Sequence, residues 1–73
     1  TLSYATLKYA DLTGANLTGA TLGSANLTSA NLDNANLTYA NLIYANLTGV
    51  AGWGTVKGKD AIVGLRWAIG VPD

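Results

Sequence analysis

Leucine recurs every five residues along the first two-thirds of the chain, and from residue 7 onward an alanine stands two residues before each leucine. A period of five fits neither the 3.6-residue repeat of an α-helix nor the two-residue alternation of a strand. A chain that turns a corner every five residues would instead bring all of these side chains to one side. The pattern therefore predicts a coiled chain whose leucines and alanines point inward.

The five-residue frame reads Ala-Asn/Asp-Leu-Thr-x, as in residues 10–14, 15–19 and 25–29, and it stays in phase over residues 1–49. In this frame the chain resembles the pentapeptide-repeat family. The resemblance implies an all-β solenoid, a right-handed quadrilateral β-helix with four pentapeptides per coil. It also implies that leucine takes the central inward position and alanine the other inward position, while the remaining residues face solvent.

With twenty residues per coil, each leucine stacks on the leucine twenty positions later, because a single coil cannot bury its apolar side alone. The small alanines leave little room inside, so we expect a narrow tube without a channel. Asn and Thr at the outward positions suit corners, since their side chains hydrogen-bond nearby backbone. The predicted core consists of Leu7, Leu12, Leu17, Leu22, Leu27, Leu32, Leu37, Leu42 and Leu47.

The repeat ends at residue 50, and the composition of residues 50–73 changes abruptly. Ile62, Leu65 and Ile69 follow helical spacing, with Asp60 as a candidate N-cap. We therefore predict a loop followed by a short C-terminal α-helix that caps the last coil, with Trp53 or Trp67 filling the hole at its edge. This divides the chain into a β-helix (1–49) and a cap (50–73) within one domain.

Composition narrows the chemistry. The chain has 73 residues, a formal net charge of zero, and neither cysteine nor histidine. It therefore has no Cys or His nucleophile and no zinc site built from these residues. No apolar run approaches the ~20 residues of a membrane-spanning helix, so direct membrane insertion is not predicted. No catalytic, metal-binding or cofactor-binding residue is predicted.

The chain begins inside a repeat and contains no methionine. We expect a soluble domain or fragment of a larger protein, whose parent is either soluble or membrane-anchored; the compartment stays open. The first coil has no cap in this sequence. Either further coils precede it or that end meets a partner, which includes end-to-end self-association of two copies.

Four tyrosines share one outward slot of the repeat, and they are the leading candidates for a functional surface. Tyr4 and Tyr44 fall on one face two coils apart, while Tyr39 and Tyr44 flank one corner with Ile43 beside them. Aromatic residues are enriched at interfaces, so these four residues form a candidate partner-binding surface. The alternative is packing between adjacent coils. Tyr9 takes the same slot in its own repeat.

The charged residues form no second candidate site. Asp11 and Asp33, the only carboxylates of the repeats, are interpreted as solvated surface, because catalysis needs a concave site. Lys57, Lys59 and Arg66 gather in the last third, but no basic stripe runs along the repeats. Nucleic-acid binding is therefore not predicted.

These features predict a non-catalytic structural or protein-interaction module with an unidentified protein partner. The resemblance adds that such proteins are abundant in cyanobacteria and are often attached to other domains. It also offers an alternative, a DNA-mimicking rod that binds a type II topoisomerase. Neutral charge disfavours this alternative, because a mimic of DNA needs a strongly negative surface, and the repeats provide only about 12 Å of rod.

Overall fold

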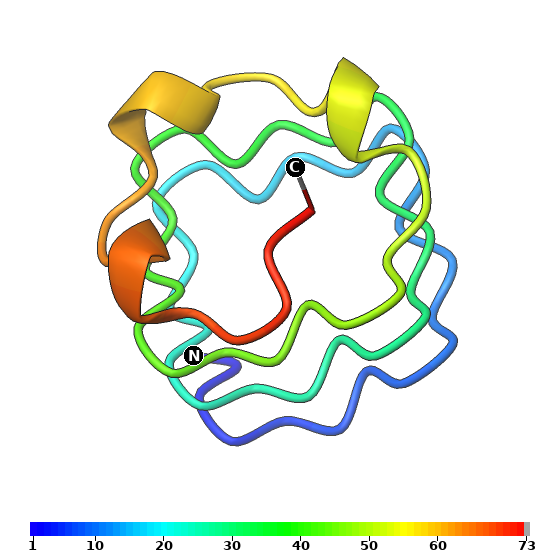
Figure 1. The fold of residues 1–73 in the computed structure, drawn as a ribbon. Coiled ribbons are helices and arrows are strands. Elements are labelled where there is room, and N and C mark those ends of the chain that lie inside the picture. The colour runs from blue at the N-terminus through cyan, green and yellow to red at the C-terminus, as the bar shows by residue number, and fades with distance from the viewer. Residues whose placement is uncertain (73) are drawn as a thin grey trace.

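The computed structural model describes residues 1–72, whose chain winds in stacked turns around a central axis (Figure 1). Isolated parallel bridges join residues twenty positions apart, as in Thr6 with Asn26 and Asn26 with Asn46. This is the register predicted from the sequence. Residues 1–72 contain no strand longer than such a bridge, because each five-residue unit turns a corner before a second residue can pair.

Each corner is a tight turn that the repeat sequence stabilises at two points. The N–H of the alanine donates to the carbonyl of the leucine three residues earlier, at 2.9 Å for Ala35 and Leu32. The asparagine before the leucine accepts from the residue after it: Asn26 Oδ1 receives the Thr28 N–H at 3.0 Å and the Thr28 hydroxyl at 2.6 Å. The Asn-Leu-Thr triplet thus fixes the turn with its own side chains, as Asx turns do.

The core is a column of stacked leucines lined by alanines. The leucines of the second and third turns are fully buried, whereas those of the first turn are half-buried and Leu2 is 38% exposed. The difference arises because no turn in residues 1–72 lies beneath the first one. The fully buried leucines are Leu22, Leu27, Leu32, Leu37, Leu42 and Leu47. No pocket opens anywhere on residues 1–72.

The predicted C-terminal α-helix is wrong. Residues 51–69 instead wind as one more turn, whose corners are the single 3-10 turns η1 (Trp53–Thr55), η2 (Lys59–Ala61) and η3 (Leu65–Trp67). Parallel bridges hold this turn to the one beneath, for example Asn41 with Val63. Residues 30–47 of the coil beneath offer the chain a row of backbone partners, whereas an isolated helix of about ten residues is marginal in water.

The last turn is built from six-residue units rather than five. A glycine with positive φ precedes each 3-10 turn, and these glycines recur every six residues. Gly52 shows why: a Cβ at this position would lie 2.5 Å from the Cα of Asp33 in the turn below. At Gly52 the backbone of the six-residue unit therefore lies directly against the backbone of the five-residue unit below, and only glycine fits there.

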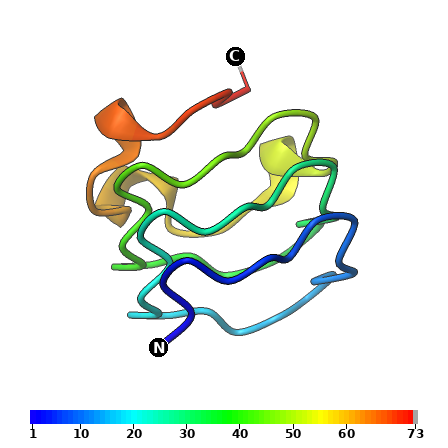
Figure 2. The ribbon, with the colours of Figure 1, turned by 90° about the horizontal axis from the view of Figure 1, so that it is seen from below.

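Larger side chains close the upper end of the core. Val56 is buried, and Trp53, Ile62 and Leu65 are half-buried against the leucine column. The last residues up to residue 72 then bend inward over the opening (Figure 1), and they lie at the opposite end of the stack from residue 1 (Figure 2). Trp53 therefore takes part in closing the core as predicted, but Trp67 does not, since it is 53% exposed.

Candidate functional site

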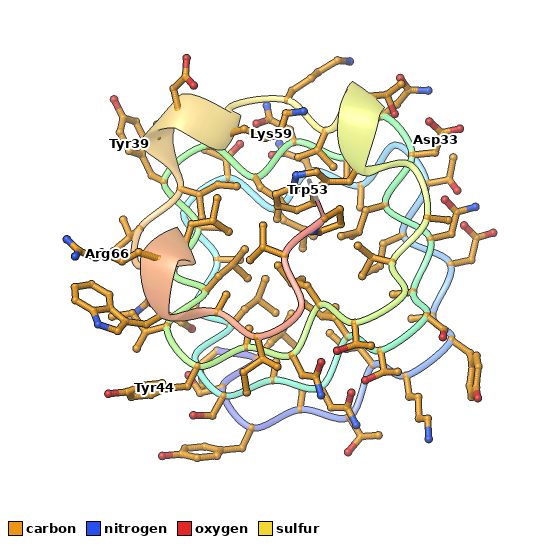
Figure 3. The ribbon with its side chains drawn as sticks, viewed as in Figure 1. Asp33, Tyr39, Tyr44, Trp53, Lys59 and Arg66 are labelled. Atoms are coloured by element: carbon orange, nitrogen blue, oxygen red, sulfur yellow. The ribbon has the colours of Figure 1, made fainter. Side chains whose placement is uncertain are left out.

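The tyrosines singled out in the sequence project into solvent at the corners of the coil. Tyr39 and Tyr44 are 67% and 62% exposed, Tyr4 is more exposed still, and Ile43 is half-buried. Tyr39 and Tyr44 stand at the two ends of one side of the coil (Figure 3). Tyr4 lies two turns below Tyr44 in the twenty-residue register. Because these rings are mostly exposed, packing between adjacent turns does not account for them.

The backbone at these tyrosines is in the left-handed region. Their φ angles are 60° at Tyr39 and 61° at Tyr44, in the slot that Gly14 and Gly19 fill in other units. A bulky side chain in this region is an outlier, and such outliers cluster at functional positions. Neither burial nor backbone preference explains why tyrosine occupies this slot.

The last turn adds three exposed apolar side chains that sequence reasoning missed, namely Val63, Trp67 and Ile69. The prediction of a capping helix hid their position in the coil, where Val63 bridges to Asn41, Ile69 bridges to Asn46, and Trp67 lies in the corner turn η3 between them. The glycines at residues 52, 58, 64 and 70 are the signal that could have placed them. A glycine every six residues indicates that the coil continues with a longer unit.

Together these residues form one continuous side of the molecule, which we call the aromatic face. Asn41 and Ile43 lie between the two tyrosine corners, and Val63 bridges directly to Asn41. Gly64 sits so close to Ile43 that an added Cβ would lie 2.1 Å from its Cγ1. The aromatic face comprises Tyr39, Ile43, Tyr44, Val63, Arg66 and Trp67.

Arg66 is the charged group of this face, and it projects outward between the two tyrosines (Figure 3). Its guanidinium carbon lies 5.0 Å from the centre of the Trp67 ring. Within residues 1–72 the guanidinium forms neither a hydrogen bond nor an ion pair. Lys59 differs, because its ammonium donates to the carbonyl of Trp53 at 3.1 Å and is thereby tied to the fold.

A family comparison agrees with this architecture. The family described as Pentapeptide repeats matches residues 1–19 and 15–50, in eight copies. The chain belongs to the pentapeptide-repeat family. A search of curated proteins found no match. Pentapeptide repeats form solenoids of the β-helix type, and proteins built from them are generally non-catalytic structural or interaction modules.

Within this pentapeptide repeat, the two aspartates of the coil serve the turns. Asp11 takes the slot of asparagine and accepts from the Thr13 hydroxyl at 2.6 Å and the Thr13 N–H at 3.1 Å. These two hydrogen bonds, the hydroxyl first, lower the pKa of Asp11 below its ordinary value. Asp33 accepts a hydrogen bond from the Thr55 hydroxyl. Both carboxylates hold the backbone at corners away from the aromatic face.

Residues 1–72 offer no assembled site for chemistry. They contain no cluster of acidic side chains suited to a metal ion. No helix in this part of the chain is long and apolar enough to cross a membrane. On the aromatic face, exposed aromatic and apolar side chains from two turns surround an arginine that has no hydrogen-bond or ion-pair partner within residues 1–72. This face is therefore the candidate functional site.

Proposed function

We propose that this pentapeptide-repeat protein is a non-catalytic interaction module that contacts a protein partner through its aromatic face. The observation that carries the proposal is the pair of solvent-exposed tyrosines held at positive φ, Tyr39 and Tyr44. Their side chains gain nothing from burial, and their backbone conformation opposes them. Tyr, Trp and Arg are the residues most enriched in the energetic centres of protein interfaces, and this face carries all three.

The size of the face limits the area that a partner can cover. The molecule measures 24 × 23 × 21 Å, so one side offers on the order of 450 Å², and a partner that covers it buries roughly 900 Å² in total, the size of a weak or transient interface. A rigid coil suits this role, because few side chains must be ordered when the partner arrives.

The finer architecture that we propose is a right-handed quadrilateral β-helix. Two features support it: four five-residue units separate the bridge partners within the repeats, from Thr6 with Asn26 to Asn31 with Ala51, and the chain advances toward the viewer anticlockwise around a four-sided outline (Figure 1). Flat sides joined by tight corners make the aromatic face a plane bounded by its two tyrosines.

The DNA-mimicking alternative finds less support. The chain carries four basic and four acidic residues, so it has no phosphate-like field that would attract a DNA-binding enzyme.

A second proposed contact is the lower end of the coil. Within residues 1–72, the N–H and C=O groups of Thr6, Asp11 and Asn16 have no backbone partner, although the equivalent groups of Asn26, Asn31 and Asn36 bond to the turn below. We propose that this edge seats another turn of five-residue units, supplied by adjoining chain or by a second copy. Unpaired edges of this kind recruit further strands.

Selection from a random-peptide display library against the folded chain tests the proposed function. The selected peptides should bind a Tyr39→Asn/Tyr44→Asn variant at least about tenfold more weakly, because the aromatic anchors are lost. An Asn34→Gly variant is the matched control, since Asn34 fills the same slot at a corner without tyrosines. Peptides that bind the double variant and the wild type equally would overturn the proposal.

A further inference from the structure

We infer that the aromatic face recognises a protein segment in which a carboxylate lies next to an apolar side chain, and that Arg66 anchors this carboxylate. The inference rests on the proposed function and adds the chemistry of the partner. Its basis is the exposed guanidinium of Arg66, which has no hydrogen-bond or ion-pair partner within residues 1–72, the composition of the surface around it and the position of the other cations.

The Arg66 side chain is arranged in advance for a planar anion. The guanidinium lies over the indole of Trp67, with 5.0 Å between the guanidinium carbon and the ring centroid. This contact limits the orientations of the exposed side chain, whose guanidinium presents its N–H donors as a rigid fork. Such a fork matches the two oxygens of a carboxylate, with two parallel hydrogen bonds.

No acidic group within residues 1–72 satisfies this fork. Asp11 and Asp33 bond to Thr13 and Thr55 at other corners, and no ion pair joins Arg66 to Asp60, the acidic residue of η2. The aromatic face therefore carries one uncompensated positive charge. A partner with one negative charge at the matching position complements it, and this charge also selects against partners without one.

The surroundings of Arg66 select a protein partner over a polyanion. Val63 and Trp67 are exposed beside it, and Tyr44 lies one turn below, so most of the contact area is apolar or aromatic. Nucleic acid and anionic membranes are held by several basic groups acting together. Lys57 instead bridges to Asn36 on the neighbouring side, and Lys8 lies beside Tyr9. One arginine among apolar side chains is the composition of an interface anchor.

Peptides selected against the full chain supply the probe. We expect them to contain Asp or Glu adjacent to a Leu, Ile, Val or Phe, and replacing that acid by its amide should weaken binding about ten- to a hundredfold, the range of a charge-assisted hydrogen bond. Arg66→Gln should weaken binding to a similar extent, and Arg66→Lys should recover only part of it, because an ammonium lacks the fork. Lys57→Gln is the matched control and should leave binding unchanged.

The outcomes separate the inference from the proposed function. Peptides that depend on Tyr39 and Tyr44 but bind equally well without their acid or without Arg66 would overturn the inference alone. Peptides that ignore the tyrosines would overturn both. Vesicles containing phosphatidylserine and a DNA duplex are assayed in parallel. A contrary result is that the chain binds either of these more tightly than it binds the peptides, and that Arg66→Gln abolishes this binding. This result would show that Arg66 binds phosphate, and it would overturn the inference of a protein partner.

Discussion

Replacement of Gly52 by alanine tests how the last turn of the coil joins the leucine core. Gly52 has a φ of 77° and starts the first six-residue unit of that turn. An ideal Cβ at this position would lie 2.5 Å from the Cα and 2.6 Å from the backbone nitrogen of Asp33. Backbone atoms cannot rotate out of the way, so the two turns must separate.

Two costs add at this position. Left-handed backbone costs an alanine about 1–2 kcal/mol, and forcing extra volume into a packed contact costs about 1–3 kcal/mol. Separation of the turns also strains the hydrogen bond from the Leu32 N–H to the Ala51 carbonyl, which is 2.8 Å long. The expected loss in the free energy of unfolding is therefore about 2–5 kcal/mol.

Substitutions at two other glycines separate the cost of the left-handed backbone from the cost of the close contact. Gly14 has a φ of 69° but nothing within 4 Å of an added Cβ, so Gly14→Ala should cost only about 1–2 kcal/mol. Gly54 has an ordinary φ and open space, and Gly54→Ala should leave stability unchanged or slightly raised. Urea unfolding followed by the fluorescence of the half-buried Trp53 gives all three values. If Gly52→Ala is no less stable than Gly14→Ala, the close approach of the two turns is refuted.

Three further predictions concern the core, the corners and acid stability. Leu32→Ala should lower the free energy of unfolding by about 3–5 kcal/mol, and Leu2→Ala, at the exposed end, by about 1 kcal/mol in the same urea assay. Tyr44→Asn should leave stability unchanged or raise it by up to about 1 kcal/mol, because asparagine tolerates positive φ; a clear loss would mean that the ring packs. The lowered pKa of Asp11 means that its contribution to stability is present above the ordinary value of 3.8 and is lost as pH falls through the folded-state pKa. Thermal unfolding of Asp11→Asn should therefore depend less on pH in this acidic range than that of the wild type, and an identical dependence would refute the role of the Thr13 hydrogen bonds.

The repeat region could be predicted from the sequence because one pattern specifies both the turn and the core. Each unit contains the leucine that packs, the alanine that leaves it room, and the asparagine that closes the corner. The position of Leu32 above Leu12 and below the last turn follows from the five-residue period and the twenty-residue register. Stacking identical units leaves no alternative that buries these side chains equally well.

The last turn could not be predicted by the same reasoning, since its apolar spacing also fits a helix. Ile62, Leu65 and Ile69 follow a helical interval, and this local pattern competes with the glycines at every sixth position. What decides the outcome is the third turn beneath, whose free backbone groups pair with Val63 and Ile69. That contact is tertiary, and a local sequence pattern does not contain it.

The candidate surface was predicted only in part for the same reason. Tyr39, Ile43 and Tyr44 could be grouped together from the repeat alone, but the prediction that the two tyrosines flank one corner is wrong, because they stand at the two ends of one side. Trp67 and Arg66 joined them only when the last turn was seen to continue the coil. Arg66, the charged residue of the aromatic face, lies in the segment for which the sequence pattern wrongly predicts an α-helix.

The most direct test of the central claim is a map of backbone amide chemical shifts in the isotope-labelled chain as a selected peptide is added. We predict that the shifts change, in saturable fashion, at Tyr39, Tyr44, Val63 and Trp67, while the opposite corner with Gly14 and Asn34 stays unchanged. Changes centred on that opposite corner, or spread evenly over all sides of the coil, would contradict the assignment of the aromatic face as the interaction surface.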